Sequence, residues 1–152
     1  MLDKTIILDA NLLLLLVVGL TSRTYISKHK RLRPYNEFDF DLLEGIVGSA
    51  TKIVVTPHTL AETSNLIGYI GEPAREQIYL QLRLLLGAFH ERHVESVNAA
   101  QREEFPRLGL ADAVQLELAA ESHTLLTIDL DLYLAARRRG LKAENFNYLR
   151  NM

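Results

Sequence analysis

The stretch Ile6-Ile7-Leu8-Asp9-Ala10-Asn11 governs how the rest of this chain is interpreted. Apolar residues lead directly into the acid Asp9, and a second apolar run, residues 12–18, follows almost at once. A carboxylate enclosed by core-forming residues loses its hydration, so its charge needs a helix N-terminus, a basic partner or a metal ion. The stretch therefore predicts a buried strand and a buried helix, with an acid between them that binds a partner.

The composition is that of one ordinary globular domain. The chain has 152 residues, of which 48% are hydrophobic and 24% charged, and we expect a single domain over residues 1–152. A net charge of −2 does not indicate nucleic-acid binding through the overall field. The chain has no cysteine, which excludes disulfides, thiolate zinc sites and a cysteine nucleophile and fits a cytoplasmic protein.

The N-terminal apolar run from Thr5 to Leu20 raises the alternative of a membrane anchor or a signal peptide. Asp9 and Asn11 interrupt it, and it is shorter than the ~20 residues that a bilayer crossing needs. Lys4 is the only positive charge before the run, and no cleavage pattern follows it. We therefore expect a buried strand and helix here, and no membrane partner.

Short apolar segments alternate with helical ones along the chain. Strands are expected at 4–8, 52–56, 125–128 and 142–149, and helices at 11–20, 40–49, 57–70, 73–94, 110–122 and 131–139. Thr56 and Pro57 have the pattern of an N-cap and a first helical residue, and Gly140 that of a C-cap. The alternation predicts a three-layer α/β/α sandwich with a central, mostly parallel twisted sheet.

Four acids fall at the ends of predicted strands or in the helices beside them. Asp9 and Asp129 end the first and third strands, Glu62 lies in the helix after the second, and Asp112 begins the helix before the third. The carboxyl ends of parallel strands form the ligand-binding edge of such a sheet. Carboxylates gathered there repel one another unless a cation neutralises them, and an all-oxygen group suits Mg²⁺ or Mn²⁺ better than Zn²⁺.

Each of these acids also has a structural explanation. Asp9 and Asp129 can cap the helices that follow them, Glu62 completes a capping-box pattern, and Asp112 suits a helix dipole. For any single acid, a cap explains the residue at least as well as a metal ion does. Four acids at one edge, with Thr56 available as a cap upstream of Glu62, favour a shared cation.

Residues 21–40 differ in character from the rest of the chain. Basic side chains gather there with aromatic ones between them, and no acid occurs before Glu37. The basic residues are Arg23, Lys28, Lys30, Arg31 and Arg33. The functional interpretation is an arm that contacts phosphates and stacks on bases, and the structural alternative is a solvated connecting loop.

Four segments together resemble the successive motifs of PIN domains in order and spacing. They are Ile-Leu-Asp-Ala-Asn (7–11), Thr-Pro-His-Thr-Leu-Ala-Glu-Thr (56–63), Gly-Leu-Ala-Asp-Ala (109–113) and Leu-Leu-Thr-Ile-Asp-Leu-Asp-Leu (125–132). The resemblance covers nearly the whole chain and implies an α/β/α fold with Mg²⁺- or Mn²⁺-dependent nuclease activity, usually on RNA. Many bacterial relatives are toxins of toxin–antitoxin modules, so a cognate antitoxin is an implied partner.

The resemblance also assigns roles by position. The family's catalytic and metal-binding acids are matched by Asp9, Glu62, Asp112 and Asp129. Asn11 matches a polar residue that supports the first aspartate, Thr127 matches a hydroxyl before the last, and Asp131 matches a frequent additional acid. Asn65 lies one turn beyond Glu62, and its position makes it a further supporting candidate. The basic arm is longer and more charged than the compact toxins usually show there.

The leading hypothesis is a divalent-metal-dependent endoribonuclease that hydrolyses RNA, with the basic arm holding the substrate. A second hypothesis is a PIN-like module without turnover that binds RNA or a protein, and a third is a nuclease that cleaves DNA. The apolar helices are compatible with a homodimer. Charge repulsion alone predicts that Asp9→Asn leaves the melting temperature unchanged or raises it.

Overall fold

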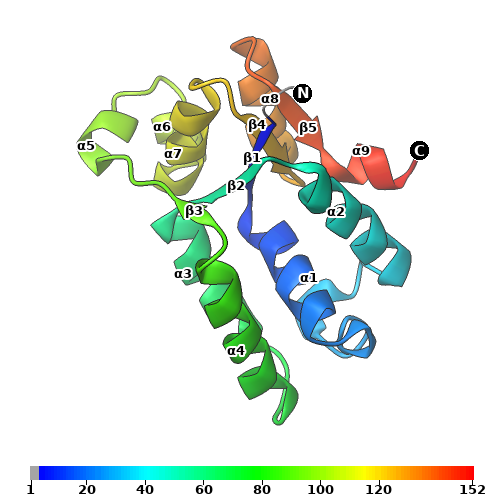
Figure 1. The fold of residues 1–152 in the computed structure, drawn as a ribbon. Coiled ribbons are helices and arrows are strands. Elements are labelled where there is room, and N and C mark those ends of the chain that lie inside the picture. The colour runs from blue at the N-terminus through cyan, green and yellow to red at the C-terminus, as the bar shows by residue number, and fades with distance from the viewer. Residues whose placement is uncertain (1–3) are drawn as a thin grey trace.

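Residues 4–152 are described in a computed structural model, in which a parallel sheet lies between two layers of helices (Figure 1). The first three positions of the predicted domain lie outside the described residues. The strands are β1 (Thr5–Leu8), β2 (Lys52–Val55), β3 (His90–Glu91), β4 (Thr124–Thr127) and β5 (Ala143–Asn145), in the order β3-β2-β1-β4-β5. The predicted three-layer α/β/α sandwich is confirmed.

Strand β1 occupies the centre of the sheet. Ile7 pairs with Val54 of β2 on one side and with Leu125 of β4 on the other, both in parallel register. Every residue of β1 is buried. Burial of every position, with apolar side chains from Ile6 to Leu8, is what a parallel sheet covered on both faces requires.

The two faces of the sheet have separate cores. Ile6 and Leu8 pack with the layer made of α1 (Ala10–Thr21), α2 (Glu37–Ser49), α3 (Pro57–Ile67), α4 (Ala74–Leu86) and α9 (Phe146–Arg150). Ile7 packs with the opposite layer, made of α5 (Ser96–Ala99), α6 (Phe105–Leu108), α7 (Leu110–Ala119) and α8 (Leu130–Arg138). The alternation of side chains along β1 thus divides the core into two.

Helix α1 is apolar around nearly its whole circumference, and it contacts α2, α3 and α4. Its residues 12–18 are all buried. Gly19 lets α2 come close, because the ring of the buried Phe40 occupies the place where a Cβ atom would stand. Within residues 4–152, none of the helices has both the length and the apolar character that a membrane crossing demands.

Several sequence-based boundaries are wrong, and α3 and α7 each end three residues early, at Ile67 and Ala119. The helix predicted at 73–94 ends at Leu86, and the chain then forms β3, whose two exposed residues pair with β2. The strand predicted at 142–149 is limited to Ala143–Asn145, because the Asn145 side chain caps α9. Helix α2 begins at Glu37 rather than at 40, because Asn36 and Asp39 form a capping box. Helix caps and strand pairing determine where these elements begin and end. The periodicity of apolar residues in the sequence reveals neither of these features.

Gly19→Ala is expected to lower the free energy of unfolding by roughly 1–3 kcal/mol, because the added methyl group overlaps the Phe40 ring. Gly45→Ala in α2 is the matched control, since a Cβ atom there meets nothing within 4 Å. Alanine is favoured over glycine in a helix by roughly 0.5–1 kcal/mol, so this control is expected to be more stable. Urea denaturation measures both, and stabilisation by both substitutions would contradict the close packing of α1 on α2.

Candidate metal centre

A small cavity of about 130 Å³ lies at the carboxyl ends of β1 and β4. Its walls come from α1, α3, α7 and α8 as well as from the two strand ends. All four predicted acids line it, together with both predicted supporting residues of the strand ends: Asp9, Glu62, Asp112, Asp129, Asn11 and Thr127. Residues that are far apart in the sequence are thus brought to one place.

Asp9 is the N-cap of α1 and is only 7% exposed. Its Oδ1 accepts a hydrogen bond from the Leu12 amide at 3.0 Å. Its Oδ2 accepts from the Thr127 hydroxyl at 2.5 Å and from the Ile128 amide at 2.9 Å. Burial raises the pKa of Asp9, while these three hydrogen bonds oppose the rise and the charge of Asp129 adds to it. Of about four lone-pair positions on a carboxylate, one remains for another ligand.

This geometry replaces the expectation for Asp9→Asn that rests on repulsion alone. An amide offers a single acceptor oxygen, so either the Leu12 or the Ile128 amide would lose its acceptor. An unpaired buried N–H group costs about 1–3 kcal/mol. We therefore expect this substitution to destabilise the protein, and other acids of the cavity are better choices for testing function.

Thr127 joins Asp9 to Asp129. Its hydroxyl donates to Asp9 and accepts a hydrogen bond from the Asp129 amide at 3.0 Å. Asp129 in turn caps α8, with its Oδ1 accepting from the Leu132 amide at 3.1 Å. The two aspartates are therefore held in fixed relative positions, and most of the acceptor capacity of Asp129 is still free.

Asp112 and Glu62 complete the wall from α7 and α3, and within the described residues neither carboxylate has a hydrogen-bond partner or an ion pair. Burial raises the pKa of Asp112 to about 6. The negative charges of Asp129, Asp9, Glu62 and Asp131 add to this rise. The acids of the cavity are therefore within electrostatic reach of one another.

Gln115 is a cavity residue that the sequence-based prediction does not include. It lies on α7 one turn beyond Asp112, lines the cavity, and is only 4% exposed. Its Oε1 atom is buried and has no hydrogen-bond partner within residues 4–152. A buried amide oxygen normally has a partner, so this one is free for a ligand. The signal in the sequence was a single polar residue within the apolar run Ala113-Val114-Gln115-Leu116.

The donor set suits a hard divalent cation. The polar groups that line the cavity offer mainly carboxylate, hydroxyl and amide oxygens, which are the ligands that Mg²⁺ and Mn²⁺ prefer. As the side chains are oriented, no three acidic or histidine residues within 4–152 form a ready-made cation site. Unpaired carboxylates repel one another, and a bound cation would offset this repulsion. The residues fit such an ion, and its binding stays a prediction.

Two predicted residues lie outside the cavity wall. Asn65 is an exposed residue of α3, and no hydrogen bond in the described part of the chain joins it to an acid of the cavity. Asp131 is exposed in the first turn of α8 and acts on Asp112 through its charge. The cavity wall therefore ends at Glu62 on α3, and at α8 it consists of the N-cap Asp129 and Leu132.

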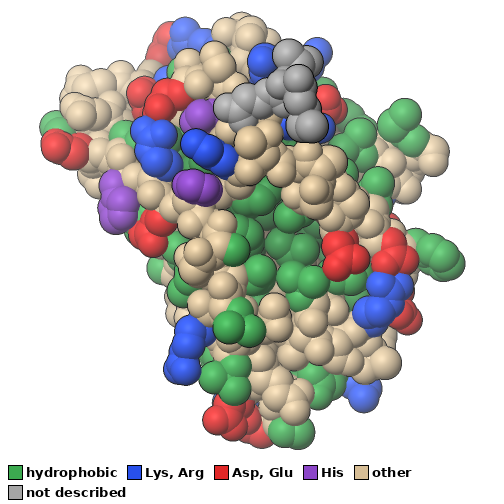
Figure 2. Space-filling view, viewed as in Figure 1, with side chains coloured by type: hydrophobic (Ala, Val, Ile, Leu, Met, Phe, Trp, Pro, Cys, Tyr) green, Lys and Arg blue, Asp and Glu red, His purple; other side chains and the backbone are tan. Residues whose placement is uncertain are grey.

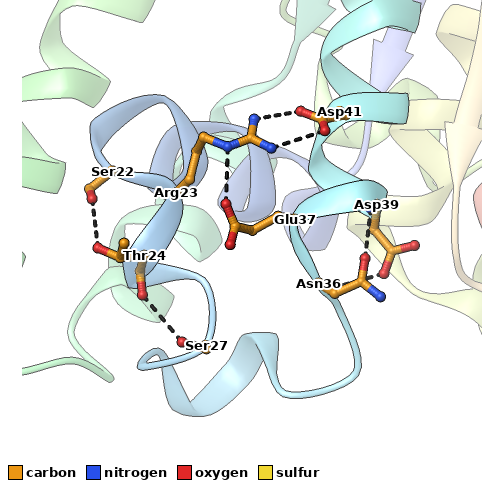
Figure 3. A network of polar contacts seen from close by, with 8 residues as sticks. All are labelled: Ser22, Arg23, Thr24, Ser27, Asn36, Glu37, Asp39 and Asp41. Atoms are coloured by element: carbon orange, nitrogen blue, oxygen red, sulfur yellow. Dashed lines mark hydrogen bonds and ion pairs between the residues drawn. The ribbon is translucent and has the colours of Figure 1, made fainter.

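The basic arm, residues 23–33, is a folded connection between α1 and α2 with two short turns, η1 (Arg23–Tyr25) and η2 (Lys30–Leu32). Arg23 forms ion pairs with Glu37 and Asp41 at the start of α2 (Figure 3) and lies over the Phe40 ring. Its charge is thus largely balanced within the protein. Helix α1 has 12 residues, so the arm begins roughly 18 Å from Asp9.

The other basic residues of the arm remain available to a ligand. Lys28 lies over the Tyr25 ring and Arg31 over the Tyr69 ring, so both cations are placed beside flat aromatic surfaces. Lys30 and Arg33 are exposed and have no ion pair within residues 4–152. The arm therefore offers up to four positive charges to an anion, rather than the predicted five.

Comparisons with models of known protein families and with curated protein sequences find no match for this chain. Among solved structures, a domain of a functionally unknown protein from Methanocaldococcus jannaschii DSM 2661 is similar to it, with a TM-score of 0.44 and 18% sequence identity. That similarity covers 94% of this chain and 91% of the other. The site therefore rests on the chain's own residues.

Asp112→Asn is expected to raise the melting temperature at pH 7.5 in EDTA and to change it little at pH 4. Because the pKa of Asp112 is about 6 in the folded protein against an ordinary 3.8, the native state binds this proton more tightly than the unfolded state. Stability therefore falls as the pH rises from about 4 to about 6, by at most about 3 kcal/mol, and asparagine escapes this loss.

Thermal denaturation across this pH range measures the effect, with the exposed Glu76→Gln of α4 as the control. The control is expected to follow the wild type at every pH. A constant difference between Asp112→Asn and the wild type from pH 4 to pH 7.5 would contradict the raised pKa of Asp112.

Proposed function

We propose that this protein is a divalent-metal-dependent endoribonuclease whose metal-binding and catalytic residues are Asp9, Glu62, Asp112 and Asp129. One observation carries the proposal: four acids from separate elements line one cavity at the carboxyl edge of a parallel sheet. The carboxylates of two of these acids have no hydrogen-bond or ion-pair partner within residues 4–152. The negative charges of the four acids repel one another, which is unfavourable unless a cation neutralises them. The likeness of four motifs to those of PIN domains supports the same proposal.

The residues divide into fixed and adjustable groups. Asp9 and Asp129 are held through Thr127 and through the helices that they cap, so they give the site its rigid frame. The carboxylates of Glu62 and Asp112 accept no hydrogen bond in the described chain and can turn toward a ligand. A bound Mg²⁺ or Mn²⁺ would supply a more acidic water molecule and stabilise negative charge that develops on phosphate.

The cavity holds the phosphodiester and not the nucleotide. Its volume of about 130 Å³ lies well below the range of roughly 300–1,000 Å³ that is typical of small-molecule pockets. A phosphate edge and water can enter, while the bases must lie outside. We assign the substrate contact beyond the cavity to Lys28, Lys30, Arg31 and Arg33, whose charges and neighbouring rings suit a single strand.

The choice of RNA as the substrate follows from the resemblance to PIN domains. Cleavage of DNA is the alternative, and digestion of mixed RNA and DNA distinguishes the two. The resemblance also extends the proposal to a cytoplasmic, toxin-type nuclease with a cognate antitoxin, and a homodimer is part of this proposal.

A binding module without turnover is the second candidate. One observation favours it: Asp9 and Asp129 are both N-caps, so two of the four acids already have a structural role. In this case the cavity would hold no cation, and the basic arm alone would bind RNA or a protein.

Wild-type protein with Mn²⁺ is expected to cleave mixed RNA, whereas Glu62→Gln and Asp112→Asn should lose roughly 100-fold or more of the activity while remaining folded. Millimolar Mn²⁺ should stabilise the wild type by about 1 kcal/mol or more, and EDTA should reverse this. Digestion of mixed RNA and DNA, with product sequencing and thermal denaturation, measures both effects. Glu76→Gln should behave as the wild type, and a protein that neither cleaves nor responds to Mn²⁺ would favour the binding module.

Lys30→Ala/Arg33→Ala is expected to weaken binding of single-stranded RNA, measured by fluorescence anisotropy in the Glu62→Gln background. Loss of two phosphate contacts should reduce the slope of log K against log salt by roughly 1.4. The matched control is Lys52→Ala/Lys142→Ala, which removes two exposed charges. These residues lie at the amino-terminal ends of β2 and β5, at the edge of the sheet opposite the acidic cavity. Equal losses in the two double variants would show that net charge, and not the arm, governs binding.

A further inference from the structure

A second cavity adjoins the acidic one and has no role so far. Its volume is about 520 Å³, and it is lined by Pro57, His58, His93, Val94, Glu95, Ser96 and Val114. On α3, His58 lines this cavity and Thr59 the acidic one; on α7, Val114 lines this cavity and Gln115 the acidic one. The two cavities therefore share the first turn of α3 and the middle of α7 as a common wall.

The second cavity lies farther along the same edge of the sheet. The acidic cavity is at the ends of β1 and β4, whereas Pro57 follows the end of β2 and His93 follows the end of β3. The sheet order places β2 directly beside β1, and β3 beyond β2 on the same side. A strand of nucleic acid that follows this edge would pass from one cavity to the other.

The wall chemistry of the second cavity suits a flat heteroaromatic ring. Pro57, His58 and His93 present rings, and Val94 and Val114 present apolar groups. Unstacked RNA bases are commonly held against histidine and other aromatic rings. In the region of β3 and α5, histidine side chains lie close to Lys and Arg side chains (Figure 2). Arg92, directly after β3, forms an ion pair with Glu121.

The same cavity has polar groups free for the edge of a base. The carboxylate of Glu95 is exposed and has no ion pair or hydrogen bond in the described chain, and Ser96 lines the same cavity. The Nδ1 atom of His58 is buried without a hydrogen-bond partner in residues 4–152. Rotation of the imidazole ring by about 180° would place this nitrogen where a ring carbon now lies.

We propose that this cavity binds one base of the RNA strand beside the phosphate at the four acids, and that Glu95 selects a base with an exocyclic amino group. The proposal rests on the proposed nuclease function. A carboxylate accepts hydrogen bonds from the amino groups of cytosine, adenine and guanine. Uracil has a single N–H between two carbonyl oxygens, and these oxygens repel the carboxylate.

Sequencing of the product ends from random-sequence RNA tests the selection. Wild-type protein should show uracil depleted roughly tenfold at one fixed position beside the cut. Glu95→Gln should abolish this depletion, and Glu76→Gln should retain it. Glu95 is exposed, so its substitution leaves the core intact. Unbiased ends in the wild type, or an unchanged bias in Glu95→Gln, would overturn the proposal.

A binding measurement separates this proposal from the nuclease itself. In EDTA, guanosine 5′-monophosphate should shift the imidazole NMR signals of His58 and His93, whereas uridine 5′-monophosphate should shift them far less. The signal of the exposed His90 is the internal control. Cleavage without base preference and without these shifts would leave the nuclease standing and remove the base site. Shifts with guanosine monophosphate in a protein that does not cleave would support the base site and remove the nuclease.

Discussion

The burial of one charge, the Asp9 carboxylate at the end of the central strand, is the constraint on which the site depends. The Leu12 amide binds one of its oxygens and thereby determines how α1 leaves the sheet. Thr127 and Ile128 bind the other and hold the end of β4 against the end of β1. Because Thr127 also accepts from the Asp129 amide, the position of the second aspartate follows from the solvation of the first.

Helix capping and cation binding are compatible roles for these acids, because they use different lone pairs of the same carboxylate. A cap takes one oxygen position of Asp129 and leaves the others. Glu62 and Asp112 do not cap a helix. Helix α3 begins with Thr56 and Pro57, and helix α7 begins with Gly109 at φ +87°. The fold thus keeps these two carboxylates free for a ligand.

What the sequence predicted well are features with strong local causes. The buried β1, the largely apolar α1, the start of α3 at Thr56 and Pro57, and the left-handed Gly140 after α8 all matched the structure. Strand β3 was missed because its two residues are exposed and are defined only by their pairing with β2. Gln115 was missed because its importance depends on which side of α7 meets the cavity. Asn65 shares a helical face with Glu62, but helical spacing does not show where a cavity ends.

The central position of β1 in the sheet also determines the order in which parts of this protein can fold. Thr127 lies 118 positions after Asp9, so the carboxylate gains its second set of partners only after most of the chain has been synthesised. Until β4 arrives, one edge of β1 is open and the apolar face of α1 has only part of its cover, a state in which chains aggregate or engage chaperones. Closure over such a separation is slow compared with local helix contacts. The cavity of acids therefore exists only in the finished fold, and a growing chain cannot carry out whatever chemistry the site performs.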